Sequence, residues 1–471
     1  MEKLANFFKV KESGSTVKTE IMAGFTTFMA TVFTIIAIPN MINSAMPIEY
    51  RHPGIVYAVF IAACLSAAFG TLLKALYAKI PFVQAPGMGL GSYFAGTVMG
   101  GMATMAGMPY LSHLQQYQMA ITIVFIAGML FTLSTLFGIR EAIVNAVPKN
   151  IKLAMGAGIG LFITLLGLRF SGIVINSPGT FVTMVNFSQV EMGMDTPEGA
   201  RAMGAILAIL GLLLIIILSI KKVKGSILIG VIATTIANYA FGVVSLPENF
   251  SFNLAERFSY FFELSFFRFD FSFINANTQW GTLLAFILAF LFVNMFDALG
   301  TIFGISAANG LVDENGEVIG LEKGLTADAI GTAASGILGT STVTTVVSSA
   351  SGISEGGRTG LTALTAAILF LVALVFAPFV VLIPNMAVAP ALIYVGFLMV
   401  SHVKEVDFSD WAEAFPAFLT IVIMPLSFSI ANGIAFGLIS YIVIKTCTGR
   451  IKEVKPLAVV IALLFVLQYI L

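Results

Sequence analysis

Long apolar runs separated by short polar breaks recur along the chain from Ile21 onward. A helix needs about 20 residues to cross a hydrocarbon core of roughly 30 Å, and most of these runs approach that length. The breaks predict about fourteen spans and an apolar tail, at residues 19–40, 54–77, 85–103, 117–138, 149–168, 201–220, 225–244, 280–306, 326–338, 340–356, 360–383, 387–403, 411–428, 430–446 and 456–471. The pattern is typical of one all-α polytopic membrane domain with short loops. The tail is short for a crossing, so it either spans the bilayer with help or lies along its interface.

The composition is typical of an integral membrane protein. It is 58% hydrophobic and 10% charged, whereas a soluble domain carries about 25% charged residues. The formal net charge is zero, which gives no electrostatic reason to expect nucleic acid as a partner. Cys64 and Cys447 lie far apart in apolar surroundings, so we expect no disulfide framework, metal site or cofactor.

The distribution of basic residues predicts the orientation. We place the polar N-terminal tail, residues 1–18, in the cytoplasm and let the loops alternate between the two sides. Most Lys and Arg then fall inside, as the positive-inside rule requires. The exceptions, all outside, are Arg51, Arg169, Arg201, Arg257 and Arg268.

Two spans have features that a lipid-facing helix avoids. The third, between Pro81 and Met102, carries a second proline and many glycines, and the tenth lies in a Ser/Thr-rich run, Gly336–Gly360. Irregular backbone survives in a membrane only where it is buried in protein or lines a wet cavity. We therefore predict extended backbone at 82–84 followed by a helix from near Gly87. In the tenth span we predict extended backbone at 337–339 and a helix from near Thr342.

The two breaks fall at corresponding positions in the two halves of the chain, because each is the third span of seven. Paired breaks of this kind indicate an inverted-repeat transporter whose solute binds between the two half-helices. The free N–H groups at a half-helix N-terminus suit such a role. Tight helix packing through small residues is the alternative explanation for the glycines.

A single charged residue, Asp297, lies between Phe271 and Leu311, near the middle of the eighth span. A charged Asp at a helix centre costs about 2.5–3.5 kcal/mol even on the gentler insertion scale, so it usually serves an ion or solute pathway. It could accept hydrogen bonds from N–H groups of a solute, or carry a proton, since burial favours the neutral carboxyl. A structural bond to another helix is the alternative. Asn294 and Thr301 share its helical face.

Other polar residues suggest less. Glu20, Asp328 and Glu355 lie near span ends and are interpreted as interfacial. The histidines His52, His113 and His402 map to loops or span ends, so no nucleophile–base pair or metal constellation is expected and the chain is not interpreted as an enzyme. No filter motif of a channel is present.

Several motifs resemble the AzgA-like adenine/guanine/hypoxanthine permeases, a branch of the nucleobase–cation symporter (xanthine/uracil permease) superfamily. They are AGFTTF (Ala23–Phe28), QAPGMGL (Gln84–Leu90), FDALGT (Phe296–Thr301), GTSTVTT (Gly339–Thr345), GGRTGLTA (Gly356–Ala363), APALIYVGFLM (Ala389–Met399) and AFPAFLTIVIMPLSFSIANGIAFG (Ala414–Gly437). They run in the family's order over essentially the whole chain.

The resemblance implies two intertwined inverted repeats of seven spans, with a core domain (19–138 and 280–383) and a gate domain (149–244 and 387–471). It implies import of a purine-type nucleobase by proton symport across the plasma membrane, and a possible homodimer. Asp297 would bind the solute and couple the proton. The other implied solute-binding residues are Gly87, Met88, Gly89, Leu90, Thr340, Ser341, Thr342, Ser348 and Phe33. The implied supporting residues are Asn294, Thr301 and Gln84.

The chain departs from the family at five of its polar positions. Relatives usually carry Asn, Glu, Asp, Tyr and Asn where this chain has Gly91, Ser348, Asn294, Phe33 and Ile38. Since a lost charge-assisted hydrogen bond typically costs about 1.5–3 kcal/mol, a divergent paralogue with a different small heterocycle is an alternative. An anion, as in the sulfate-permease relatives, is a second alternative, although Asp297 makes an anion site electrostatically poor.

Overall fold

The computed structural model describes residues 2–47, 52, 54–108, 110–138, 146–177, 179–245, 253–311 and 318–470. Helices make up most of it. Those of the first half are α1 (Glu2–Phe7), α2 (Val17–Thr31), α3 (Phe33–Ala45), α4 (Ile55–Leu73), η2 (Lys74–Ala78), α5 (Met88–Tyr93), η3 (Phe94–Met99), α6 (Gly100–Met105), α7 (His113–Leu136), α9 (Lys149–Phe170), η4 (Phe187–Met192), α10 (Pro197–Ile220) and α11 (Ser226–Ala240).

The second half of the chain is also mostly helical. Its helices are α12 (Leu254–Tyr260), η5 (Phe261–Ser265), α13 (Trp280–Ala308), α14 (Leu321–Leu338), α15 (Ser349–Ser354), α16 (Gly360–Ala373), η6 (Leu374–Leu382), α17 (Asn385–Val400), η7 (Ser401–Glu405), α18 (Trp411–Leu426), α19 (Ile430–Cys447), η8 (Ile451–Glu453) and α20 (Pro456–Ile470). The strands are β1 (Gln84–Pro86), β2 (Val174–Ser177), β3 (Phe181–Met184) and β4 (Val343–Thr345).

The apolar runs predict these elements well. In the described part of the chain, nine helical segments are long and apolar enough to cross a membrane, and α11, α18 and α20 are shorter apolar helices. The third and tenth predicted spans coincide with β1–α5–η3–α6 and β4–α15. The predicted tail is helix α20, which packs against α13 and α19.

The helices pack in two sets. In one set α7 lies against α14, and α16 lies against α2 and α4. In the other, α9 packs against α17 and α18, while α10 lies beside α11 and α17. Small residues allow these close approaches: a Cβ added at Gly128 would lie 2.4 Å from the backbone nitrogen of Ala333, and one at Gly160 would lie 2.8 Å from the carbonyl of Gly396. Close backbone approach through small residues is typical of helix contacts in lipid.

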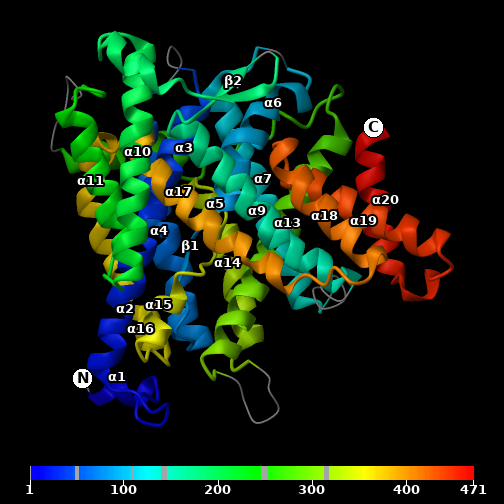
Figure 1. Ribbon diagram of the computed structural model, residues 1–471. Helices are drawn as coiled ribbons and strands as arrows, with labels where there is room; N and C mark the ends of the chain where they lie inside the picture. The colour runs from blue at the N-terminus through cyan, green and yellow to red at the C-terminus, as the bar shows by residue number, and fades with distance from the viewer. Residues whose placement is uncertain are drawn as a thin grey trace.

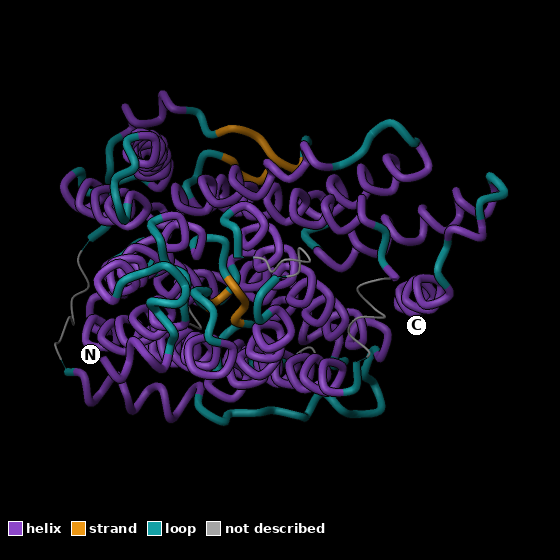
Figure 2. The backbone as a smooth tube through the Cα atoms, turned by 90° about the horizontal axis from the view of Figure 1, so that it is seen from below, coloured by secondary structure: helices purple, strands orange, loops and turns teal. Residues whose placement is uncertain are grey.

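The broken elements lie in the middle of this arrangement. Figure 1 shows β1 and α5 near the centre, with α10 and α11 to the left and α18, α19 and α20 to the right. Seen from below, the short strand pair β1–β4 is surrounded by helices (Figure 2). The second pair, β2–β3, lies at the edge of the molecule.

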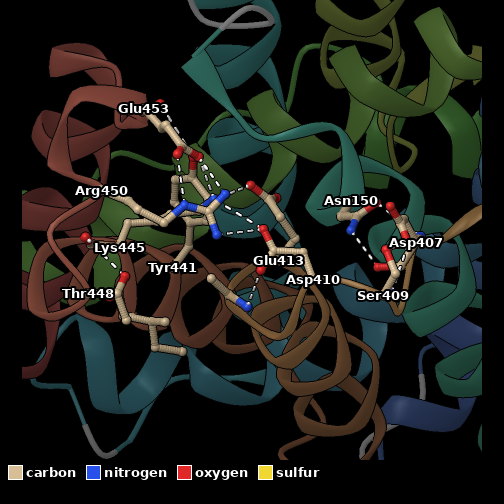
Figure 3. A network of polar contacts seen from close by, with 12 residues as sticks. Asn150, Asp407, Ser409, Asp410, Glu413, Tyr441, Lys445, Thr448, Arg450 and Glu453 are labelled. Atoms are coloured by element: carbon tan, nitrogen blue, oxygen red, sulfur yellow. Dashed lines mark hydrogen bonds and ion pairs between the residues drawn. The ribbon is translucent and has the colours of Figure 1, made fainter.

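A polar network ties α18 to the end of α19 (Figure 3). The Lys445 ammonium lies 2.9 Å from the Glu413 carboxylate and 2.7 Å from that of Glu453. Arg450 donates to Asp410 and Glu453, at 2.7 Å in each case. Hydrogen bonds from Arg450 and Lys445 lower the pKa of Glu453 to about 2. These contacts hold η8 in place, and they therefore also fix the position at which α20 begins.

Glu20 is not interfacial, as the sequence suggests, but completely buried. Its carboxylate accepts hydrogen bonds from the backbone N–H groups of Arg358, Thr359 and Thr362 and from both threonine hydroxyls. These donors lie at the N-terminus of α16, where free N–H groups and the helix dipole favour an anion. Glu20 of α2 therefore caps a helix from the other half of the chain.

We expect Glu20→Gln to lower the stability of the folded protein by about 2 kcal/mol or more, because a charge-assisted hydrogen bond contributes roughly 1.5–3 kcal/mol. Thermal unfolding of the detergent-purified protein measures this change. Glu12→Gln is the matched control, since the exposed Glu12–Lys9 pair lies on the surface and contributes at most about 1 kcal/mol. Equal melting temperatures for the two variants would contradict the capping role.

Candidate functional site

The two interrupted spans meet through a short antiparallel strand pair. Gln84 lies opposite Thr345, and Pro86 lies opposite Val343. The ladder extends on both sides, because the Gly87 N–H donates to the Thr342 carbonyl at 3.1 Å and Val346 donates to Val83 at 3.1 Å. Every residue of both strands is buried. Backbone that leaves the helix inside a membrane thus finds its hydrogen-bond partner in the other interrupted span.

The third span breaks where the sequence predicts. Gly87 has extended dihedral angles and precedes α5, and Met88, Gly89 and Leu90 form its first turn. The helical path continues through η3 and α6 to Met105. The predicted extended piece at 82–84 and the strand at Gln84–Pro86 overlap at one residue.

The tenth span breaks later than predicted. Residues 337 and 338 end α14, the extended piece is Val343–Thr345, and the next helix begins at Ser349. Thr342 is therefore not the start of a half-helix. The reason is that the threonine- and valine-rich stretch pairs with β1, and β-branched residues fit a strand better than a helix.

Four hydroxyl groups around this pairing lack a partner. The side-chain oxygens of Thr340, Ser341, Thr342 and Thr344 are buried and form no hydrogen bond. Leaving a buried polar group unpaired costs about 1–3 kcal/mol, and four such groups in five residues form an unusual concentration. The cluster is therefore suited to a polar solute that supplies the missing partners.

Asp297 lies on α13, which packs against β4 and α5. Its side chain is half-buried, and within the part of the chain that the structure describes its carboxylate has no hydrogen bond or ion pair. An unpaired acid at this depth is an available acceptor for N–H groups. Thr301, one turn on, is also buried.

Unlike the Asp297 carboxylate, the amide nitrogen of Asn294 has a hydrogen-bond partner among the residues that the structure describes. It donates to the hydroxyl of Thr332 on α14. That hydroxyl also lies 3.0 Å from the carbonyl of Val343 in β4. Asn294 therefore connects α13 to α14 and β4, which supports the strand pair rather than extending a polar stripe with Asp297.

The supporting residue Gln84 acts mainly through its backbone. The hydroxyl of Thr71 accepts from the Gln84 N–H at 3.0 Å and donates to its carbonyl at 2.9 Å. The side-chain amide lies between α4 and α14, close to Gly70 and Gly331. Through Thr71, the Gln84 backbone thus fixes β1 against α4, whereas both polar atoms of the side-chain amide are buried without a hydrogen-bond partner.

Ser348 and Phe33 lie toward the first span. The hydroxyl of Ser348 is 2.7 Å from that of Thr31 at the end of α2. Phe33 begins α3 and is buried in the main hydrophobic core. Of the predicted residues, the structure joins Gly87 and Thr342 directly through a backbone hydrogen bond, whereas Gly89 faces Ile159 of α9 and Ser348 follows β4 at the next turn.

The sequence does not reveal an ion pair behind the strands. The Lys74 ammonium lies 2.6 Å from the Asp328 carboxylate, and both side chains are completely inaccessible. Thr345 donates to both carboxylate oxygens, at 2.9 and 2.8 Å. Asp328 is thus not interfacial, contrary to the sequence-based interpretation. The spacing Asp328–Thr332–Ser335 on one face of a small-residue helix is the signal that could have indicated burial.

Residues 18–436 match the model of the Permease family. The chain belongs to this family. A permease of Methanocaldococcus jannaschii, MJ0326, is 39% identical over 470 residues, covering 100% of this chain and 99% of that protein. The guanine/hypoxanthine permease PbuG of Bacillus subtilis is 35% identical, covering 99% of each chain. The adenine permease AdeP of Escherichia coli is 33% identical, covering 99% of this chain and 96% of that one.

Solved structures confirm the fold class of this Permease family member. The transmembrane domain of the cyanobacterial bicarbonate transporter BicA superposes with a TM-score of 0.60 at 17% identity, covering 88% of this chain and 97% of that one. SLC26A9 superposes with a TM-score of 0.58 at 10% identity, covering 95% and 70%. The chain is thus a multi-pass membrane transporter with the inverted-repeat fold of seven plus seven segments.

We expect Asp328→Asn and Lys74→Met each to destabilise the permease by about 3–5 kcal/mol, because either change leaves one buried charge without its partner. The double variant removes both charges, so we expect it to lose less than the two single losses combined. Thermal unfolding of the three variants in detergent measures the coupling. Strictly additive losses would show that the two side chains do not stabilise each other.

Proposed function

We propose that this permease imports a purine-type nucleobase, which binds at the β1–β4 pairing. The observation that carries the proposal is the unpaired Asp297 carboxylate on a helix that packs against β4, in and just before which lie four unpaired hydroxyls. A purine base carries N–H donors and ring-nitrogen acceptors, which match a carboxylate and hydroxyls respectively. The names of the relatives PbuG and AdeP support the same substrate class.

The roles of the residues follow from their chemistry. Asp297 accepts hydrogen bonds from N–H groups of the base. The hydroxyls of Thr340, Ser341 and Thr342 donate to its ring nitrogens or carbonyl oxygens. The backbone of Gly87–Leu90 closes the opposite side, with Ser348 and Phe33 toward the first span. Asn294, Thr301 and Gln84 support these groups.

We further propose that Asp297 couples solute movement to a proton. Moving an unpaired carboxylate through a low-dielectric interior is costly, and a bound proton removes that charge. Lys74, a cation near the strand pair, is already neutralised by Asp328 and cannot balance Asp297. A proton is thus the simplest ion that restores neutrality.

The transport step is a movement of a core domain (19–138 and 280–383) against a gate domain (149–244 and 387–471). Among the polar contacts that cross this boundary, Lys224 forms an ion pair with Glu355 at 2.8 Å, and the Tyr239 hydroxyl donates to the Leu382 carbonyl at 3.0 Å. We place the protein in the plasma membrane, with the first contact on the cytoplasmic side, where the N-terminus lies, and the second contact on the outer side. A homodimer through the gate domain belongs to the same proposal.

An anion is a weaker candidate than a purine. The likeness to anion transporters rests on the fold alone, at 17% identity or less. Asp297 would repel an anion. The guanidinium of Arg358 donates to the carbonyls of Ile353 and Gly357, so it is already engaged near the end of α15.

Cells that express the protein should accumulate labelled hypoxanthine, guanine or adenine, and a protonophore should collapse the accumulation. Asp297→Asn should lower the affinity by about 10-fold or more, since a charge-assisted hydrogen bond contributes roughly 1.5–3 kcal/mol. It should also abolish uphill transport. Initial uptake rates over a range of solute concentrations and external pH values measure both effects.

Asp195→Asn is the control for this experiment, because Asp195 is an exposed loop carboxylate. The two variants should be equally abundant in the membrane and elute alike in size-exclusion chromatography. If Asp297→Asn accumulated the solute as the wild type does, Asp297 would neither bind the solute nor couple its movement to a proton. Uptake of bicarbonate or sulfate, but of no purine, would overturn the substrate class.

A further inference from the structure

One point between the two interrupted spans is filled by a side chain from the first span. Gly91 lies in α5, one turn after Gly87. A Cβ built on Gly91 would lie 2.0 Å from Cδ1 of Ile38 and 3.3 Å from the hydroxyl oxygen of Ser341. Both of these side chains are completely buried. The terminal methyl of Ile38 therefore occupies the space that any side chain at position 91 would need.

The same point lies next to an unsatisfied polar group. The hydroxyl of Ser341 has no hydrogen-bond partner. The backbone carbonyl of Thr342, the next residue, accepts a hydrogen bond from the Gly87 N–H. A buried hydroxyl without a partner is costly, and a polar solute placed beside it would supply that partner. Ile38 consequently adjoins the position where we place the solute, and it contributes only hydrocarbon there.

We propose that Ile38 is a specificity-determining residue, whose terminal methyl limits the size of the purine that the site admits beside Ser341. This inference rests on the proposed function. A methyl group cannot donate or accept a hydrogen bond, so it favours an unsubstituted C–H edge of the solute over a polar substituent. One methylene more or less in an apolar pocket changes discrimination by about 10–200-fold.

The first test widens the site. Ile38→Val removes Cδ1, and the probe is a panel of purine bases that each carry one methyl group at a different ring position. Competition against labelled hypoxanthine or adenine uptake gives an inhibition constant for each. At least one methylpurine should gain about 10-fold or more relative to its unsubstituted parent. An unchanged order across the whole panel would overturn the proposal.

The second test uses the geometry of the contact. Gly91→Ala places a methyl 2.0 Å from Ile38 Cδ1, so we expect loss of uptake. Adding Ile38→Val should restore it, because valine lacks Cδ1 and the next nearest atoms, Ser341 Oγ and Ile38 Cγ1, lie at 3.3 and 3.4 Å. The restored variant should exclude the methylpurine that Ile38→Val alone admits. Failure to restore uptake in a folded double variant would contradict the assignment.

Ile35→Val is the matched control, since Ile35 is on the same helix and completely buried but is not among the nearest neighbours of Gly91. It should leave the order of the methylpurines unchanged. The failures of the two proposals differ. If the wild-type protein takes up no purine, the proposed function is wrong. If it takes up purines but Ile38→Val and Ile35→Val give the same order of methylpurines, only the role of Ile38 is wrong.

Discussion

The backbone hydrogen bonds between β1 and β4 are the constraint on which the site depends. A chain that stops being helical inside a membrane must find partners for its N–H and C=O groups, and here each interrupted span supplies them to the other. The pairing fixes the start of α5 against the approach to α15. As a result the unpaired hydroxyls of Thr340–Thr342 lie next to β4, and α13, the helix that carries Asp297, packs against this strand.

A layer of buried polar contacts surrounds the strands and holds them in place. Thr71 grips β1 through both backbone groups of Gln84. Asp328, neutralised by Lys74, holds Thr345 of β4. The backbone groups of Gln84 and the Asp328 carboxylate are thus satisfied, whereas the hydroxyls of Thr340, Ser341, Thr342 and Thr344 are not.

The sequence predicts the spans and the break at Gly87 because hydropathy, proline and glycine act locally. It also singles out Asp297 as a candidate site residue, since a lone charge in a long apolar run has no local explanation. It misplaces the tenth break and takes Glu20 and Asp328 for interfacial residues. Those three errors share a cause: each residue's environment is set by a segment from elsewhere in the chain, namely β1, the N-terminus of α16 and Lys74. The partition into core and gate comes from the resemblance rather than from local pattern.

The antiparallel register also has a consequence for biogenesis. β1 belongs to the half of the chain that leaves the ribosome first, and its partner belongs to the half that leaves last. While translation continues, the nascent third segment sits in the bilayer with open backbone groups, which other parts of the insertion machinery or water must cover. Completion of the tenth segment therefore closes the ladder late, and the solute site that we propose forms only after that segment has been synthesised.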